Sequence, residues 1–240
     1  MALLFACVAA AAVGFVLAQG GGSSHSAALG PTGHRAGTTT VVSTTTTTPT
    51  TTTTVPPTTT TTTGPGSLPQ TSALPTTTSP VFAANMAALW SGVSSGVAQN
   101  AVPGFFPEPA YLQLKDISGA ASDYTERLIA EYEEDVASAH QLLGPDAASA
   151  QLVGVDVDAA YAHWVAPGAC YNGVGYFEVP NSRVLYMVDG QERSFGIASM
   201  ISWRGEWYIV HLGAVLRPGD GGTVDDPQSG PGVPSYSSTC

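Results

Sequence analysis

The feature that most constrains this chain is a change of composition near residue 80. Nineteen of the twenty-six residues from Thr38 to Thr63 are threonine, and residues 20–79 contain one charge, Arg35. Such a segment has too little apolar surface to offset the entropy of ordering it. From residue 80 to 218, aromatic residues, mixed charges and alternating apolar positions return. The sequence therefore predicts a disordered Thr/Pro-rich stalk at 20–79, a folded head at 80–218 and a disordered tail at 219–240.

Residues 1–19 are predicted to be a membrane anchor or a signal peptide. The run from Ala2 to Ala18 has no charge, which is the short end of a membrane span. It also fits the apolar part of a signal peptide, with small residues before Gln19 as a cleavage site. Both alternatives place the stalk and head outside the cytoplasm. We expect a single-pass protein of the cell membrane with an extracytoplasmic head, or a secreted protein.

Charge and cysteine content exclude several functions. The formal net charge is -11, and an acidic chain is repelled by nucleic acid, so no nucleic-acid partner is expected. Cys7 lies in the apolar start, which leaves Cys170 and Cys240. In an oxidising compartment these two could form a disulfide, and the alternative is two unpaired thiols. The cysteines lack the spacing of a zinc site, so we predict no metal and no cofactor.

The first half of the head is predicted to be helical. Apolar residues at helical spacing run from Val81 to Val97. The apolar segment Phe105–Leu114 forms a loop or a short helix. Ser122 or Asp123 can cap a further helix, which ends before Gly144.

The second half is predicted to be an antiparallel sheet. Strands are expected at Gln151–Asp158 and Tyr161–Val165, and hairpin turns at Pro180-Asn181, Asp189-Gly190 and Arg204-Gly205. Two-residue turns would place Glu178 beside Arg183, Phe177 on one face with Ile201, and Tyr176 on the other face with Met200. Both faces are then apolar, whereas a sheet covered on one side alternates apolar with polar residues. Something must cover the second face.

The second face supplies the predicted interaction surface. We expect four of its residues to be shielded from water, because a monomer seldom exposes so large an apolar patch; they are Met187, Met200, Trp207 and Ile209. The cover is the Phe105–Leu114 segment, a second copy of the head, or a ligand. A homodimer or an envelope protein is therefore a possible partner, besides the membrane at the N-terminal segment.

Helices followed by a long curled meander resemble the α+β cone of NTF2-like and cystatin-like domains, in which the sheet wraps the helices and often leaves a pocket. Three runs are similar to a group of uncharacterised actinobacterial envelope proteins with an anchored or exported chain and a Thr/Pro stalk. These runs are Phe105–Glu108, Asn172–Tyr176 and Ser194–Trp203 continuing to Gly213. The resemblance covers roughly residues 89–216, and it implies a location but no reaction.

Candidate chemistry is sparse. Asp156, Tyr176 and His211 could line a ligand pocket, with a carboxylate as general base, although His211 in mid-strand also fits a core histidine. The chain has no nucleophile or phosphate-loop motif, so we name no catalytic residue and do not predict an enzyme. The first hypothesis is an extracytoplasmic interaction or assembly module. The alternative is an NTF2-like pocket that binds or transforms a small apolar ligand.

Overall fold

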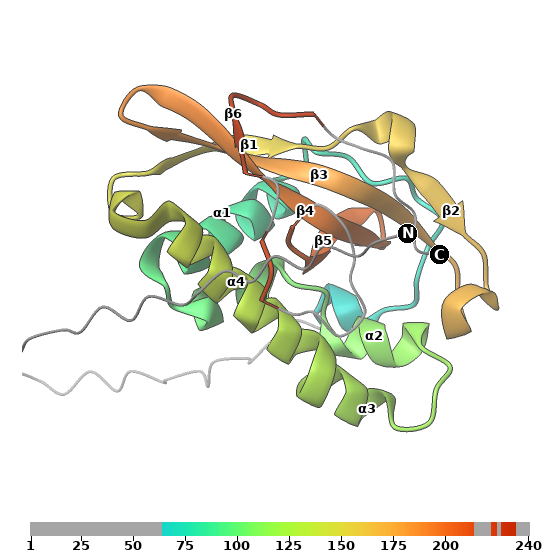
Figure 1. The fold of residues 1–240 in the computed structure, drawn as a ribbon. Helices are drawn as coiled ribbons and strands as arrows, with labels where there is room; N and C mark the ends of the chain where they lie inside the picture. The colour runs from blue at the N-terminus through green and yellow to red at the C-terminus, as the bar shows by residue number, and fades with distance from the viewer. Residues whose placement is uncertain (1–63, 214–221, 225–226, 234–240) are drawn as a thin grey trace, which may run out of the picture. The chain divides into compact units, whose positions relative to one another are not determined.

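The computed structural model describes residues 64–213, 222–224 and 227–233 (Figure 1). This part of the chain packs helices against one curled antiparallel sheet, so the predicted α+β cone is confirmed. None of the helices within these residues is long and apolar enough to cross a membrane. The predicted anchor at 1–19, the threonine tract to Thr63 and Cys240 lie outside the described residues.

Helix α1, Pro80–Ser95, begins and ends at signals that the sequence carries. The Ser79 hydroxyl accepts a hydrogen bond from the backbone N–H of Phe82 at 2.9 Å, and Pro80 occupies the first turn, where its missing N–H costs nothing. Gly96 ends the helix at φ 69°, a conformation that glycine adopts without strain. The helix buries one face, formed by Phe82, Met86, Leu89 and Val93.

The remaining helices are α2, α3 and α4. Helix α2, Glu108–Leu114, follows a 3₁₀ segment at Ala98–Gly104. Helix α3, Ala120–Asp123, runs through a π-helical turn at Tyr124–Leu128 into α4, Ile129–Leu143. The prediction that Ser122 or Asp123 caps this helix is wrong. Gly119 precedes the helix at φ 80°, and Asp123 lies inside it, where its carboxylate contacts other side chains.

The strands form one sheet in the order β1-β3-β4-β5, with β2 beside β3 and β6 beside β4. Their bounds are β1 Gln151–Asp156, β2 His163–Val165, β3 Tyr176–Val188, β4 Gln191–Trp203, β5 Glu206–His211 and β6 Gln228–Ser229. The predicted turns at Asp189-Gly190 and Arg204-Gly205 are confirmed. All four turn residues have φ between 50° and 81°, as a two-residue type I′ hairpin requires.

The predicted hairpin at Pro180-Asn181 is wrong, because β3 runs straight through it. Pro180 pairs with Ser199 and Ser182 with Ile197, so the strand keeps one register against β4. Asn181 adopts φ 49° within the strand, which asparagine tolerates better than most residues.

The missing turn corrects the predicted faces. Glu178 lies opposite Ile201 and not beside Arg183, which pairs with Gly196 and Asp156. Since opposed residues share a face, Tyr176 and Glu178 lie on the face of Ile201. Phe177 lies on the other face.

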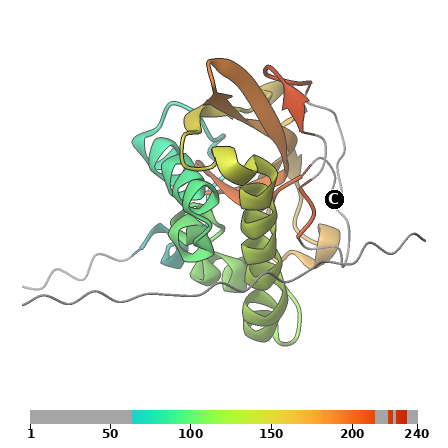
Figure 2. The same ribbon diagram turned by 60° about the vertical axis from the view of Figure 1, so that its left-hand side comes forward.

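We call the face toward the helices the inner face. The ring of Tyr186 on β3 lies 5.7 Å from that of Trp90 on α1 and 6.0 Å from that of Phe195 on β4. Behind these rings, Phe105 stacks on Tyr132 of α4 at 4.5 Å. Figure 2 shows the sheet curling over α1 and α4. This inner core is the one that the helical periodicity predicts.

An extended segment, residues 68–79, which we call the strap, is bonded to the end of β4 and reaches the outer face at Trp207. The Trp203 indole donates to the Leu68 carbonyl at 3.2 Å. The Gln70 amide donates to the Ser202 carbonyl at 2.9 Å and accepts from the Arg204 backbone N–H at 2.6 Å. The predicted head boundary at Pro80 is therefore too late. The tail prediction also needs correction, because β6 at 228–229 pairs with β4.

Three of the four predicted interaction residues are buried within a single chain. Met200 and Ile209 are fully buried and Trp207 is 2 % exposed, whereas Met187 is half-buried. Phe105 and Phe106 extend the sheet beside β5, since Phe105 bridges to Ile209 and the Phe106 N–H donates to the Ile209 carbonyl at 3.1 Å. The strap covers part of the outer face, since its residues 74–78 line a hollow with Trp207. These three side chains therefore offer no surface to a second copy.

Candidate functional site

A hollow of about 180 Å³ opens between the helices and the inner face of the sheet. It lies where α2 and the π-helical turn face β3, β4 and β5. Its walls combine apolar and polar side chains from all of these elements: Tyr111, Leu114, Lys115, Arg127, Leu128, Tyr176, Glu178, Ser199, Ile201, Val210 and His211. Polar groups that converge in a concave, partly apolar site are typical of ligand pockets.

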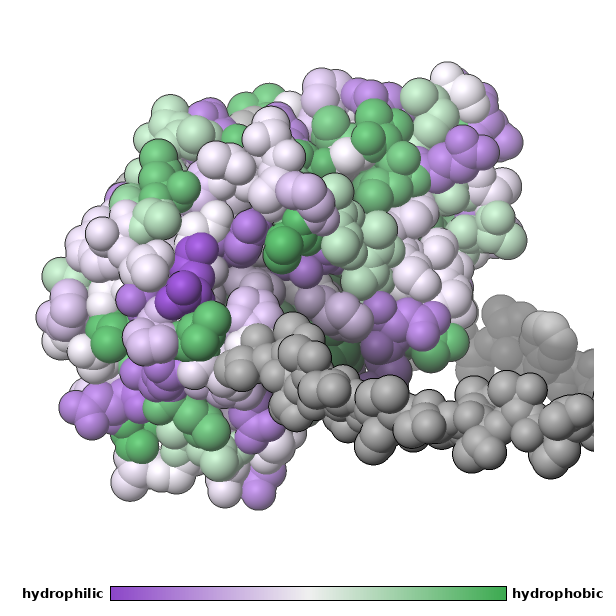
Figure 3. Space-filling model, turned by 180° about the vertical axis from the view of Figure 1, so that it is seen from behind, coloured by the Kyte–Doolittle hydropathy of each residue, from purple (hydrophilic) through white to green (hydrophobic). Residues whose placement is uncertain are grey.

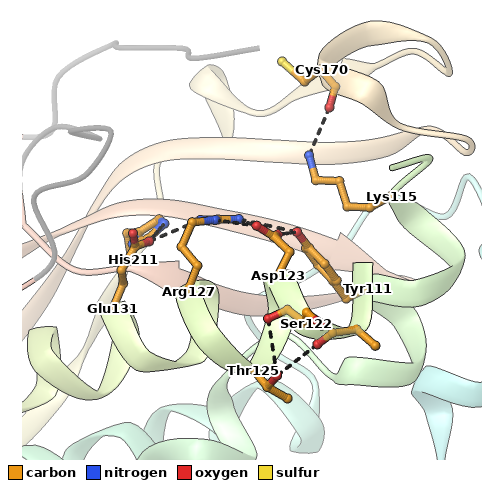
Figure 4. Close-up of polar contacts among 10 residues, drawn as sticks. Tyr111, Lys115, Ser122, Asp123, Thr125, Arg127, Glu131, Cys170 and His211 are labelled. Atoms are coloured by element: carbon orange, nitrogen blue, oxygen red, sulfur yellow. Dashed lines mark hydrogen bonds and ion pairs between the residues drawn. The ribbon is translucent and has the colours of Figure 1, made fainter. Parts of the chain in front are cut away.

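A row of hydrogen-bonded side chains forms the helix-side rim (Figure 4). The Tyr111 hydroxyl donates to Asp123. The Arg127 guanidinium donates to both Asp123 oxygens at 2.7 Å and to Glu131 at 3.2 Å. A bidentate pair of this kind has a fixed geometry. The row therefore holds Tyr111 and Arg127 in place at the hollow.

The row changes the protonation of its members. Its hydrogen bonds from Arg127 lower the pKa of Asp123, so this carboxylate is charged at neutral pH. Burial raises the pKa of Tyr111, and the hydrogen bond to Asp123 raises it further, so its hydroxyl stays a donor. The π-helical turn between Asp123 and Ile129 sets the positions of these groups, and such turns are frequent at functional sites.

His211 closes the row at the end of β5. Its ring nitrogens lie 3.6 Å from Asp135 and 3.9 Å from Glu131. Asp135 is 2 % exposed and accepts backbone hydrogen bonds from Leu212 at 3.0 Å and Gly222 at 2.9 Å. Asp135 thus joins α4 to the chain that follows β5 and keeps His211 at the edge of the hollow.

The sheet contributes a buried carboxyl group to the hollow. Glu178 on β3 is 2 % exposed. One of its oxygens lies 3.5 Å from the His163 ring on β2, and the other accepts from the Ser199 hydroxyl at 3.5 Å. The buried carboxyl group therefore faces the hollow together with Ser199.

Lys115 stands at the C-terminal end of α2. Its ammonium group donates to the Cys170 carbonyl at 3.0 Å (Figure 4). Burial lowers the pKa of Lys115, and the positive charge of Arg127 lowers it further, whereas Asp123 and Glu178 act in the opposite direction. The cation of Lys115 therefore lies in the field of both an anion and a cation of the site.

The structure brings together two of the three predicted pocket residues. Tyr176 and His211 both line the hollow, and burial raises the pKa of Tyr176, so its hydroxyl remains protonated. Asp156 does not line it: this residue is exposed on β1, opposite Arg183 near the middle of β3. Asp156 lies away from this hollow because its strand pairs with the other half of β3.

Sequence reasoning missed Glu178, Lys115, Arg127 and Ser199. For Glu178 a signal existed: it is two residues from Tyr176, and so shares its face in any straight strand. The predicted turn at Pro180-Asn181 concealed the pairing with β4. Nothing in the sequence places Lys115 or Arg127 opposite the sheet, because helix orientation depends on tertiary packing.

Cys170 is disulfide-bonded in the structure, and both other cysteines of the chain lie outside the described residues. The pairing of Cys170 with Cys240 stays a prediction. Within the described residues, His, Cys, Asp and Glu side chains form no group of three or more that could hold a metal ion. Comparison of this chain with protein-family models, curated proteins and solved structures finds no match.

Proposed function

We propose that this chain is an extracytoplasmic ligand-binding protein, whose head takes a small molecule into the hollow between α2, the π-helical turn and the sheet. The observation that carries the proposal is the convergence of Lys115, Glu178, Ser199 and His211 from four separate elements on one hollow. Gathering these polar groups around one hollow adds nothing to the stability of the fold, since each must be desolvated.

The first hypothesis, an assembly module, loses one of its three motivations. The doubly apolar sheet offered a face to a partner, but Met200, Trp207 and Ile209 are buried within the chain. Figure 3 shows hydrophobic residues in small separate groups on the face it presents, without the broad patch that marks an interface. Both arguments favour a pocket over a docking face.

The location outside the cytoplasm is part of the proposal and follows from the N-terminal composition. An uncharged apolar run at residues 2–18 precedes a Thr/Pro tract, as expected of an anchored or exported head. The disulfide at Cys170 supports this location, because disulfides persist in oxidising compartments. Protease added to intact cells with a permeable wall should release the head, and full protection would contradict the location.

The ligand-binding proposal is tested by filling the hollow. Val210 lines it, so Val210→Phe should occupy its space without reaching the rim. A library of small probes is screened by NMR against the purified full-length chain, and hits must shift the signals of Ile201 and Tyr176. We expect Val210→Phe to abolish these shifts. Val153→Phe is the matched control, because Val153 is 51 % exposed on β1.

Two results would contradict the proposal. One is a complete library that leaves the signals of Ile201 and Tyr176 unchanged in the wild-type chain. The other is binding that Val210→Phe leaves intact, which would place the ligand elsewhere.

A further inference from the structure

The two cations that line the hollow differ in what they contact. Arg127 lies between two carboxylates, 2.7 Å from both oxygens of Asp123 and 3.2 Å from Glu131. The ammonium group of Lys115 donates instead to a neutral acceptor, the Cys170 carbonyl, at 3.0 Å (Figure 4). Within the described part of the chain, no carboxylate forms an ion pair with Lys115. The charge of Lys115 is therefore the one that a ligand can complement.

The surroundings of Lys115 are unfavourable for its charge. The side chain is half-buried. Burial lowers the pKa of Lys115 most, and the positive charge of Arg127 lowers it further. Asp123 raises this pKa and Glu178 raises it least, so the two carboxylates do not offset the burial of the cation. An anion bound next to the ammonium group would offset it.

Lys115 also has donors to offer such an anion. An ammonium group has three N–H donors, and the Cys170 carbonyl takes one. The guanidinium group of Arg127 is already bonded to Asp123, Tyr111 and Glu131. An anionic group of a ligand therefore belongs at Lys115, at the end of α2.

Glu178, the buried carboxyl group of the hollow, contacts other strands of the sheet. Its oxygens lie 3.5 Å from the His163 ring on β2 and 3.5 Å from the Ser199 hydroxyl on β4. Because like charges repel, the anionic group of a ligand lies at the α2 end of the hollow, and its uncharged part extends toward the sheet. Charge thus fixes the orientation of the ligand.

Size and wall chemistry limit the rest of the ligand. Apolar side chains line the hollow beside Lys115, contributed by Leu114, Leu128, Ile201 and Val210. A cavity of roughly 150 Å³ holds a molecule such as benzene, and this one measures about 180 Å³. The hollow therefore fits a short apolar body and not an extended chain.

Resting on the proposed function, we infer that the ligand is a small apolar carboxylic acid of the size of benzoic acid, bound as its anion. Its carboxylate pairs with the ammonium group of Lys115, and its apolar body packs against Leu128 and Ile201. A neutral or cationic molecule of the same shape binds more weakly, because it leaves the charge of Lys115 without a partner.

The composition of the chain makes this contact directly observable. Lys115 is the only lysine in the sequence, so lysine labelled with carbon-13 at Cε gives a single side-chain NMR signal. Benzoate, benzamide and benzylamine, which share a ring and carry a negative, no and a positive charge, are titrated against the full-length chain at neutral pH. The lysine signal is followed together with those of Ile201 and Val210. We expect benzoate to bind about tenfold or more tightly than the other two, because its contact with Lys115 is charge-assisted.

Two further measurements test the charge and the apolar body separately. Bound benzoate should raise the pKa of Lys115, read from the pH dependence of the single lysine signal, because a neighbouring anion favours the charged form. Acetate has the charge without the ring and should bind more weakly than benzoate.

A variant assigns the charge to its residue. Lys115→Met should remove the advantage of benzoate over benzamide. Arg193→Met is the control with the same charge change, because Arg193 lies outside the hollow, 3.8 Å from Asp146; it should leave the affinities for all probes unchanged. If Lys115→Met does not fold, the lysine signal of the wild-type chain still decides.

The outcomes separate the two proposals. If benzamide, benzylamine or acetate binds in the hollow as tightly as benzoate, the inference of an apolar acid is wrong and the ligand-binding function stands. The same conclusion follows if probes shift the signals of Ile201 and Val210 but leave the lysine signal and its pKa unchanged. If neither these compounds nor the wider library binds in the hollow, the proposed function itself fails.

Discussion

The two faces of the sheet are buried by different means. The inner face packs against helices, through contacts such as Trp90 with Tyr186. The outer face near Trp207 is covered in part by the strap, an extended segment that hydrogen bonds to Ser202, Trp203 and Arg204 hold to the end of β4. Helical cover depends on apolar area, whereas the strap depends on a few directed bonds. The two faces should therefore respond differently to substitution.

The largest expected effect is at Met200, which is fully buried on the outer face opposite Val179 and Ile209. Met200→Glu places a carboxyl group where it has no water, and should cost about 4 kcal/mol of unfolding free energy or prevent folding. Chemical denaturation measures the loss. Val153→Glu, on the exposed side of β1, should change stability by less than about 0.5 kcal/mol.

The Met200 variant also tests whether the outer face is covered as deeply as the inner one. A folded Met200→Glu chain of unchanged stability would mean that the strap side opens freely to water. In that case the inner face would be a buried core and the outer face a solvent-exposed surface, so the two faces would not both be covered.

The strap itself is tested at Gln70, whose side-chain amide bonds the backbone of both Ser202 and Arg204. Gln70→Ala leaves a carbonyl and an N–H without these partners, so we expect a loss of about 2 kcal/mol. Gln99→Ala is the control, because Gln99 is exposed and its side-chain bond is to the side chain of Glu133 and not to the backbone. Hydrogen exchange at Arg204 should accelerate in Gln70→Ala. If Gln70→Ala and Gln99→Ala lost the same unfolding free energy, the bonds from the strap to the sheet would stabilise the protein no more than an exposed side-chain bond does.

The same contrast explains what the sequence could predict. Helix α1 and the turns at Asp189-Gly190 and Arg204-Gly205 follow from local signals, because caps and positive-φ turns depend on neighbouring residues. The strap has the Thr/Pro composition of the predicted stalk before it. Its order depends on hydrogen bonds to the sheet, which its own sequence does not reveal. Leu68 of the strap and Trp203, which form a hydrogen bond, are 135 residues apart in the sequence.

Only part of the candidate site could be predicted, because some of its residues follow from local patterns and others depend on tertiary packing. Tyr176 and His211 could be named because they stand in strands with clear alternation. Lys115 and Arg127 reach the hollow through the orientation of α2 and the π-helical turn, which no local pattern encodes. The error at Pro180-Asn181 came from a sound turn signal that the pairing of β3 with β4 overrides.

The smallest expected effect distinguishes the two faces by pH. On the helix side, the buried Tyr124 hydroxyl donates to the Phe106 carbonyl at 2.9 Å. Burial, followed by the negative charge of Glu108, raises the pKa of Tyr124 to about 12. Because the folded pKa exceeds the ordinary value of 10, the folded state holds this proton more tightly. Its contribution to stability is complete below pH 10 and is lost as pH rises toward 12.

Tyr124→Phe should therefore cost about 1 kcal/mol at neutral pH, the typical worth of one hydrogen bond. It should also reduce the fall in stability between pH 10 and 12, measured by urea denaturation at each pH. Tyrosines such as Tyr132 and Tyr176, whose pKa values burial also raises, keep part of the alkaline slope in the variant. Gln70→Ala removes strap bonds in which no group titrates over this range, and so should lower stability by the same amount at every pH. Suppose that Gln70→Ala reduced the fall in stability between pH 10 and 12 as much as Tyr124→Phe does. The strap and the helices would then be energetically coupled, and both faces of the sheet would respond to pH together.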